Sequence, residues 1–260
     1  MHARAALFDL YGDHLRSRGG QVSVAALVRL MKPLEIAAPA VRTAVSRMVR
    51  QGWLTPLRLP NGPGYGLTPK CVRRLDEAAL RIYRAGTLGW RGRWHVIVFG
   101  PVRDRPRRER LRADLTFLGY AALSETTWIG PRSSVELDIL LEGEGVVADR
   151  FDAALEGDPR ELVARAWDLD AIAAAYERWL AEAETLVGAL PDDAPDDRVF
   201  ATRSLLVHGW RNFLFRDPGL PAELLPSGWP GEKARAYFEQ EAARLLPRAA
   251  AFVDHNLEML

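Results

Sequence analysis

The residues with the most distinctive chemistry lie on one side of a predicted helix over 39–52, PAVRTAVSRMVRQG. Its apolar side chains recur at helical spacing and predict a buried face: Val41, Ala44, Val45, Met48 and Val49. The other face carries guanidinium and hydroxyl groups: Arg42, Thr43, Ser46, Arg47 and Arg50. Guanidinium forks match the acceptor edge of guanine, and hydroxyl groups can donate to phosphates or base edges. The same pattern also fits an ordinary solvated helix face, so the neighbouring elements must decide between the two interpretations.

Two shorter helices are expected before this one. The first covers 3–15, and the Gly19–Gly20 pair that follows ends this segment. Ser23 is a suitable N-cap for the second, over 24–31, because its hydroxyl can accept a bond from a free amide of the first turn. Pro39 suits the first turn of the third helix. The sequence therefore predicts three helices in close succession.

A hairpin is expected directly after the third helix. Residues 53–59 are predicted to form a strand, which Pro56 confines to the edge of a sheet. A glycine-rich turn over 61–66 leads into a return strand that starts at Tyr65. Three helices and a hairpin follow the plan of a winged helix-turn-helix, whose third helix enters the DNA major groove. Arg58 on the hairpin is then placed to contact a phosphate.

The distribution of charge supports a polyanionic partner. Residues 1–110 carry 21 Lys and Arg against 7 Asp and Glu, whereas residues 111–260 carry 14 against 27. The formal net charge of +1 therefore conceals a front part of +14 and a remainder of −13. Such asymmetry favours nucleic acid first and a membrane surface second. Clustering of solvated arginines by chance is the alternative.

A second domain is expected in the middle of the chain. The apolar run at 94–99 predicts a buried strand, and residues 103–110 are predicted to open a helix that runs to about Leu118. Strand patterns follow at 121–129 and 135–141, and a helical pattern at 147–155. This order is that of a ferredoxin-like α/β sandwich, although the pattern leaves its last strand unassigned.

The rest of the chain is expected to be helical, over 170–187, 200–215 and 232–260. The middle helix combines cationic and aromatic side chains, which suit an anionic ligand with an aromatic group. The candidate effector-binding residues are Arg203, His208, Trp210, Arg211 and Arg216. Two structural alternatives remain open: the arginines could pair with carboxylates such as Asp217, and His208 could be a hydrogen-bonded core residue.

The sequence lacks the features expected of an enzyme or a metal site. It has a single cysteine, Cys71, and its five histidines form no His-x-x-x-His pair. The strand ending at Phe99-Gly100-Pro101 is followed by no carboxylate before Asp104. We therefore expect no catalytic residue, no metal and no cofactor. The absence of a long apolar run or signal sequence predicts a cytoplasmic protein that does not contact a membrane.

Three segments resemble the PaaX family of bacterial repressors: AVRTAVSRMVRQGWL at 40–54, GRWHVIVFG at 92–100 and RSLLVHGWRNFLFRDPGLPAELLPSGWPG at 203–231. The resemblance covers nearly the whole chain in the right order. It implies a winged helix, a central ferredoxin-like domain related to CRISPR-associated endoribonucleases, and a helical C-terminal domain. It also implies a homodimer that binds a double-stranded DNA operator of a phenylacetate-type catabolic operon. An acyl-CoA effector, phenylacetyl-CoA in the named members, is implied to release it.

The expected fold is therefore an α+β multidomain protein. Its domains are a DNA-binding winged helix-turn-helix over 1–88, a ferredoxin-like domain over 89–167 that serves dimerisation, and an all-helical effector domain over 168–260. Gly86–Gly89 is expected to be a hinge between the first two. The expected function is ligand-controlled repression. An RNA-processing or architectural nucleic-acid-binding protein built on the ferredoxin-like domain is the alternative.

Overall fold

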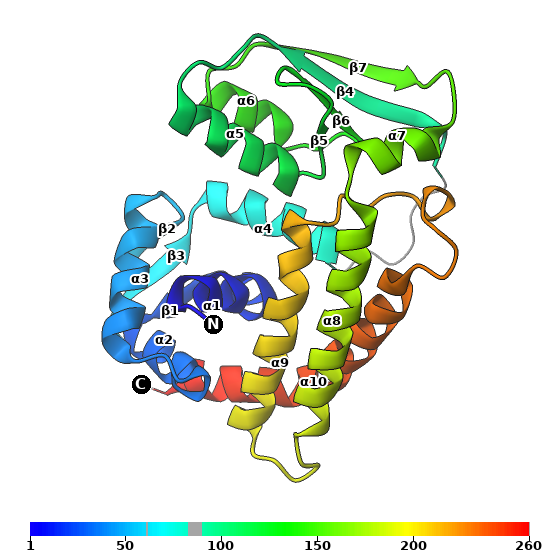
Figure 1. The fold of residues 1–260 in the computed structure, drawn as a ribbon. Helices are drawn as coiled ribbons and strands as arrows, with labels where there is room; N and C mark the ends of the chain where they lie inside the picture. The colour runs from blue at the N-terminus through cyan, green and yellow to red at the C-terminus, as the bar shows by residue number, and fades with distance from the viewer. Residues whose placement is uncertain (61, 83–89, 260) are drawn as a thin grey trace. The chain divides into compact units, whose positions relative to one another are not determined.

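Helices and two small antiparallel sheets make up the chain in a computed structural model, which describes residues 1–60, 62–82 and 90–259 (Figure 1). This confirms the α+β class. The chain divides into two compact units. Unit 1 comprises Met1–Ala79, Arg178–Trp210 and Ala234–Leu260, and unit 2 comprises Leu80–Glu177 and Arg211–Lys233. The expected hinge at Gly86–Gly89 lies outside the described residues.

The N-terminal part of unit 1 contains short helices and one sheet. Its elements are α1 (Ala3–Leu10), η1 (Tyr11–Leu15), η2 (Arg16–Arg18), β1 (Gln21–Ser23), α2 (Val24–Met31), η3 (Lys32–Leu34), α3 (Ala38–Arg50), β2 (Leu54–Leu59), β3 (Gly62–Leu67) and α4 (Pro69–Ile82). The sheet is antiparallel with strand order β1-β3-β2. The three helices and the edge strand were all expected from the sequence.

Local chemistry explains where these elements begin and end. The Ser23 hydroxyl accepts a hydrogen bond of 3.2 Å from the Ala26 amide, as expected of an N-cap. Pro39 lies in the first turn of α3, and Gly52 follows the helix with a φ of 72°. The return strand starts at Gly62, so the prediction that it starts at Tyr65 was wrong.

The glycine content of β3 accounts for this difference. Gly64 pairs with Ser23 of β1 on one side and with Leu57 of β2 on the other. A Cβ atom at Gly64 would lie 2.7 Å from the backbone oxygen of Val22, so only glycine allows β1 to approach so closely. A glycine run that is typical of a turn is here the central strand of a sheet.

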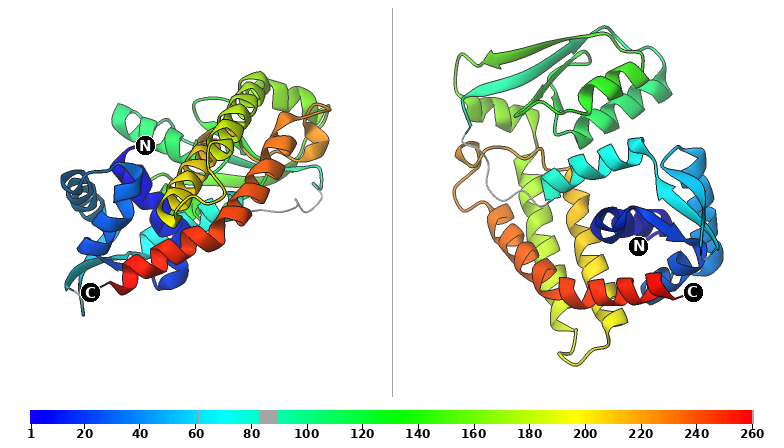
Figure 2. Two further views of the ribbon diagram at one scale, coloured as in Figure 1. Left: turned by 90° about the horizontal axis from the view of Figure 1, so that it is seen from below. Right: turned by 180° about the vertical axis from the view of Figure 1, so that it is seen from behind.

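The core of unit 1 joins distant parts of the chain. Leu27, Met31 and Met48 from the N-terminal elements share a buried cluster with Phe200 of α9 (Asp196–Arg211) and Val253 of α10 (Pro230–Glu258). The other contributing helix is the C-terminal part of α8 (Leu169–Gly188), which lies beside α9 as its antiparallel neighbour (Figures 1 and 2). Its ring contacts with α9 and α10 form a second buried group: Trp179, Trp210 and Phe238.

Hydrogen bonds fasten the end of α10 to the N-terminal elements of unit 1. The Arg18 guanidinium donates to both carboxylate oxygens of Asp254, at 2.6 and 3.0 Å. Arg29 donates to the backbone oxygens of Asn256 and Met259, at 2.7 and 3.0 Å. These bonds place the two ends of the chain within one folded body (Figure 2).

Unit 2 contains the second sheet. Its elements are β4 (Arg93–Phe99), α5 (Arg105–Phe117), β5 (Ala121–Ala122), β6 (Thr127–Gly130), α6 (Leu137–Gly143), β7 (Ala148–Ala154), α7 (Pro159–Ala166), η4 (Asn212–Phe215) and η5 (Ala222–Leu224). The sheet is antiparallel with order β5-β6-β4-β7. The element order β-α-β-β-α-β is consistent with a ferredoxin-like sandwich.

Two predictions in this region were wrong, and one helix was not predicted. The run 135–141 was expected to be a strand, but Leu137 and Leu141 lie one helical turn apart on the buried side of α6. The run 147–155 was expected to be a helix, but it forms β7, which pairs with β4 over seven residues. Helix α7 was not expected at all, although Asp158 caps it and Pro159 starts it.

The apolar run of β4 is buried at Trp94, Ile97 and Phe99 and half-buried at the three residues between them, so the prediction of a buried strand holds in part. Trp94 belongs to a cluster with Ile129 of β6 and Leu162 of α7. Ile97 and Phe99, on the opposite face, are also buried. Among the described residues, no helix is long and apolar enough to cross a membrane.

Candidate functional site

The exposed face of α3 carries all five side chains that the sequence placed there. Arg42, Thr43, Ser46, Arg47 and Arg50 are exposed, whereas Val41, Ala44, Val45 and Met48 are buried beneath them. Val49 is half-buried. No residue in the described part of the chain forms an ion pair with the three arginines of this face. Their guanidinium groups are therefore available to an external anion.

Contacts at the C-terminal end of α3 hold this face in place. The Thr68 hydroxyl donates to the backbone oxygen of Gly52 at 2.7 Å. The Lys70 ammonium group donates to the backbone oxygen of Gln51 at 3.2 Å and lies 4.3 Å from the ring centre of Trp53. The start of α4 therefore fixes the end of α3, a positioning role for Lys70 that the sequence analysis missed.

Arg58 is exposed on β2, the edge strand that follows α3. It pairs in register with Pro63 of β3. Helix α3 packs against β2, the strand that carries Arg58. We call the six residues the α3–β2 face: Arg42, Thr43, Ser46, Arg47, Arg50 and Arg58.

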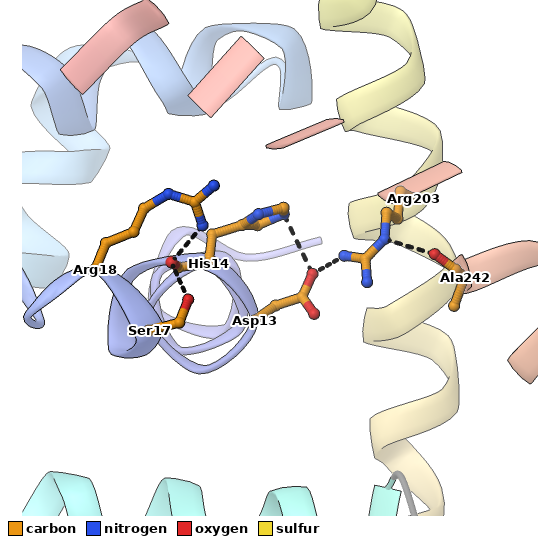
Figure 3. Close-up of polar contacts among 6 residues, drawn as sticks. All are labelled: Asp13, His14, Ser17, Arg18, Arg203 and Ala242. Carbon is orange, nitrogen blue, oxygen red and sulfur yellow. Dashed lines mark hydrogen bonds and ion pairs between the residues drawn. The ribbon is translucent and has the colours of Figure 1, made fainter. Parts of the chain in front are cut away.

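The candidate effector residues fall in different units. Arg203, His208 and Trp210 belong to unit 1, whereas Arg211 and Arg216 belong to unit 2. Arg203 is only 2% exposed. Its guanidinium group bonds to the Asp13 carboxylate and donates to the backbone oxygen of Ala242 at 3.0 Å (Figure 3). Burial lowers the Arg203 pKa to about 10.

His208 and Trp210 also have partners inside unit 1. The His208 Nδ1 atom lies 2.8 Å from the Asp9 carboxylate, and burial lowers the pKa of this imidazole. Trp210 stacks on Phe238 with 4.8 Å between ring centres, and the Arg235 guanidinium group lies 5.9 Å from the Trp210 ring. Helix α9 is thus joined to α1 and η1 through two carboxylates.

The remaining two candidates lie in unit 2. Burial lowers the Arg211 pKa to about 10. Arg216 is exposed, next to Phe215, whose side chain is 54% exposed. Asp217, which was considered as a partner for these arginines, bonds instead to the Tyr176 hydroxyl and accepts from the Gly219 amide at 2.7 Å.

His14 is a further buried group beside the Arg203 pair. Its Nε2 atom lies 3.2 Å from the Asp13 carboxylate, as Figure 3 shows. Burial lowers the His14 pKa to about 4, with a smaller contribution from the Arg18 charge that the Asp254 charge opposes.

The roles of Asp9, Asp13 and His14 were not predicted from the sequence. The available signal was two carboxylates inside the apolar stripe of an N-terminal helix, where a charge needs a partner. The partners lie 190 or more residues away, so the sequence could not identify them. Asp104, the first carboxylate after β4, caps α5 by accepting from the Arg107 amide at 2.8 Å.

Known proteins resemble this chain over nearly its full length. Three family models match it: PaaX-like protein over residues 2–71, PaaX protein central Cas2-like domain over 87–155, and PaaX-like protein C-terminal domain over 167–255. It is 31% identical over 262 residues to transcriptional repressor PaaX of Escherichia coli (strain K12), covering 96% of this chain and 82% of that protein.

A solved structure shares the fold. Uncharacterized protein Rv0674 from Mycobacterium tuberculosis matches with a TM-score of 0.56 and 25% identity, covering 96% of this chain and 98% of that one. The family models and the curated relative agree with this likeness, and they show that the chain belongs to the PaaX family.

Proposed function

We propose that this protein is a cytoplasmic, DNA-binding transcriptional repressor of a phenylacetate-type catabolic operon. The observation that carries the proposal is the α3–β2 face, because its arginines have no carboxylate partner in the described part of the chain. Support also comes from the similarity to transcriptional repressor PaaX. A cationic helix on a firmly packed support is what a DNA-reading surface requires.

In this proposal the first elements of unit 1 act as a winged helix-turn-helix. Helix α3 enters the major groove, where Arg42 and Arg47 read guanine edges through paired hydrogen bonds. Thr43, Ser46 and Arg50 contact phosphates or neighbouring base edges. The β2–β3 hairpin is the wing, and Arg58 contacts a phosphate there. The same arrangement could bind RNA in the alternative, RNA-processing role.

A gel-shift titration of the full chain tests DNA binding. The probes are the promoter region upstream of its own operon, a scrambled duplex and a single-stranded RNA of equal length. We expect preference for the promoter, and a loss of about 1–3 kcal/mol for Arg42→Ala or Arg47→Ala. Arg198→Ala, an exposed arginine of α9, is the matched control. Unchanged promoter affinity in the Arg42/Arg47 double variant, or preference for the RNA, would contradict the proposal.

We further propose that an acyl-CoA such as phenylacetyl-CoA releases the repressor from its operator. The support is the cationic and aromatic character of α9, where Arg203, His208 and Trp210 lie near one another along the helix. Two of these are held by carboxylates, Asp13 and Asp9. The phosphates of a CoA thioester would compete with those carboxylates for the same donors. Arg211 and Arg216 remain candidate contacts on the strength of the sequence.

Competition of the ligand with Asp9 and Asp13 would explain how ligand binding at α9 weakens DNA binding by α3. Helix α1 packs against α3, which carries the DNA-contacting side chains. Displacing Asp9 and Asp13 frees α1 from α9, and α3 then loses its support. The ligand thereby favours a form that binds DNA poorly, as release requires.

The repressor is proposed to act as a homodimer without catalytic activity. A two-fold protein matches a palindromic operator with half-sites about one helical turn apart. Light scattering of the purified chain should give twice 29.0 kDa. Incubation with Mg²⁺ or Mn²⁺ should leave RNA and DNA uncut. Metal-dependent cleavage that Asp104→Asn abolishes would support the RNA-processing alternative instead.

A further inference from the structure

A second cationic site lies in unit 2, far along the chain from the α3–β2 face. A pocket of about 150 Å³ opens where β4 ends and α5 begins. Its apolar side is formed by Phe99, Leu111 and Trp128, all buried. The charged side chains that line it are Arg103, Arg108, Arg112 and Glu125, which gives the lining a formal charge of +2.

The other arginines of α5 show what is unusual about this group. Arg107 and Arg110 lie 3.8 and 3.2 Å from the Glu144 carboxylate, so both have a carboxylate partner, which they share. Arg108 and Arg112 are one helical turn apart and line the pocket together, an arrangement in which like charges repel. Neither is in an ion pair with another described residue, and neither is Arg103.

Arg108 and Arg112 contact only uncharged groups among the contacts that follow, so these contacts do not neutralise their positive charges. Arg108 donates to the backbone oxygen of Val102 at 3.2 Å, which orients its guanidinium group. The Arg112 guanidinium group lies 5.9 Å from the ring centre of Trp128. The pocket therefore offers donors and positive charge, with Glu125 as its single carboxylate.

We propose that this pocket binds a small phosphorylated ligand of the nucleotide class. A phosphate dianion would relieve the repulsion among Arg103, Arg108 and Arg112 and accept charge-assisted bonds from their guanidinium groups. The carbon part of the ligand would cover the apolar side, beside Phe99. A free nucleotide and the nucleotide part of a CoA thioester share this chemistry. Binding at this pocket can be titrated without DNA, so its test can fail or succeed separately from the test of operator binding.

Isothermal titration calorimetry of the full chain at low ionic strength tests the proposal. The probes are AMP, 3′,5′-ADP, coenzyme A, adenosine and inorganic phosphate. We expect the phosphorylated nucleosides to bind at least about tenfold more tightly than adenosine, because only they reach the guanidinium groups. Tighter binding of coenzyme A than of 3′,5′-ADP identifies a CoA thioester as the source, and the reverse identifies a free nucleotide.

Matched variants assign the binding to this pocket. Arg103→Gln and Arg112→Gln should each weaken nucleotide binding about tenfold, and Glu125→Gln should tighten it by removing the opposing charge. Arg110→Gln removes a charge from the same helix outside the pocket and should have little effect. Three results overturn the proposal: no nucleotide binding, an Arg110→Gln loss equal to that of Arg112→Gln, or pocket variants that affect only single-stranded RNA binding.

Discussion

At the scale of single residues, the buried Arg203–Asp13 pair should make a large contribution to stability. Arg203 is 2% exposed, and a buried charge that loses its partner costs about 3–5 kcal/mol. Arg203→Met should therefore lower the free energy of unfolding by roughly that amount in urea titrations. The double variant Asp13→Leu/Arg203→Met removes both charges and should recover much of the loss. Equal instability of the single and double variants would contradict this account.

His14 makes the stability of unit 1 depend on pH. Its pKa is about 4 in the folded protein against 6.5 in the unfolded chain, because burial disfavours the imidazolium form. As pH falls from 6.5 to 4, the unfolded chain takes up a proton that the folded protein does not. The group's contribution is thus fully present above pH 6.5 and is lost below it, by about 3 kcal/mol at pH 4.

The variant His14→Gln isolates this contribution from that of the carboxylates. Urea unfolding at pH 7.5 and pH 4.5 should show a smaller loss of stability in the variant than in the parent protein. The difference between the two losses is the measured quantity, since other titrating groups cancel. Parallel pH profiles would show that His14 is not buried in its neutral form.

At the residue scale, the sequence predicted which side chains of a helix are exposed, but it did not predict which residues form ion pairs. Helical periodicity separated Arg42 and Arg47 from Met48, because exposure depends on local geometry. It could not show that Arg203 would pair with Asp13, since that contact depends on how α9 packs against η1. The arginines around Trp128 were likewise hidden in a run that looks uniformly charged.

At the scale of elements, β3 depends on one glycine. A Cβ at Gly64 would lie 2.7 Å from the backbone oxygen of Val22, so Gly64→Ala should push β1 away from the sheet. We expect a loss of about 1–3 kcal/mol in stability and weaker operator binding, because β1 leads directly into α2. Gly188→Ala is the control, since a Cβ there meets no atom within 4 Å. Equal melting temperatures for the two variants would refute the steric argument.

Helix α6 was predicted to be a strand and strand β7 was predicted to be a helix. These two elements show why the type of an element was harder to predict than its position. The segment around Leu137 and Leu141 supports both an alternating and a helical interpretation, and packing against α5 selects the helix. Phe151 in β7 is 52% exposed, so this edge strand lacks the apolar alternation that identifies strands. Its pairing with β4 is a long-range contact that no local pattern contains.

At the scale of the whole molecule, the charge asymmetry should govern how DNA binding responds to salt. The front part carries +14 and the remainder −13, so the operator must meet the former. Each phosphate contact adds about 0.9 to the slope of log affinity against log salt concentration. Arg58→Ala should reduce that slope by about this amount on operator and scrambled duplexes alike. Arg198→Ala should leave it unchanged, and an identical slope for both variants would remove Arg58 from the interface.

The proposed release by a ligand connects these scales, because it would convert a local competition for Arg203 into loss of DNA binding. A hundredfold drop in operator affinity requires a coupling of about 2.7 kcal/mol between ligand and DNA. If phenylacetyl-CoA competes with Asp13 for Arg203, weakening that pair should make release easier. Asp13→Asn keeps a hydrogen-bond acceptor but loses the charge, so half-release should need less thioester than in the parent protein. Free phenylacetate, which lacks the phosphates, should not release the complex.

Asp254→Asn provides the matched control for this measurement. It weakens the bonds from Arg18, which also join a C-terminal helix to the N-terminal elements, but it leaves the Arg203 pair intact. Fluorescence anisotropy of a labelled operator, titrated with phenylacetyl-CoA, gives the half-release concentration for each protein. A decrease in Asp13→Asn alone supports competition at Arg203. Equal half-release concentrations in all three proteins would place the effector elsewhere, and the arginine pocket beside Trp128 would then be the next site to test.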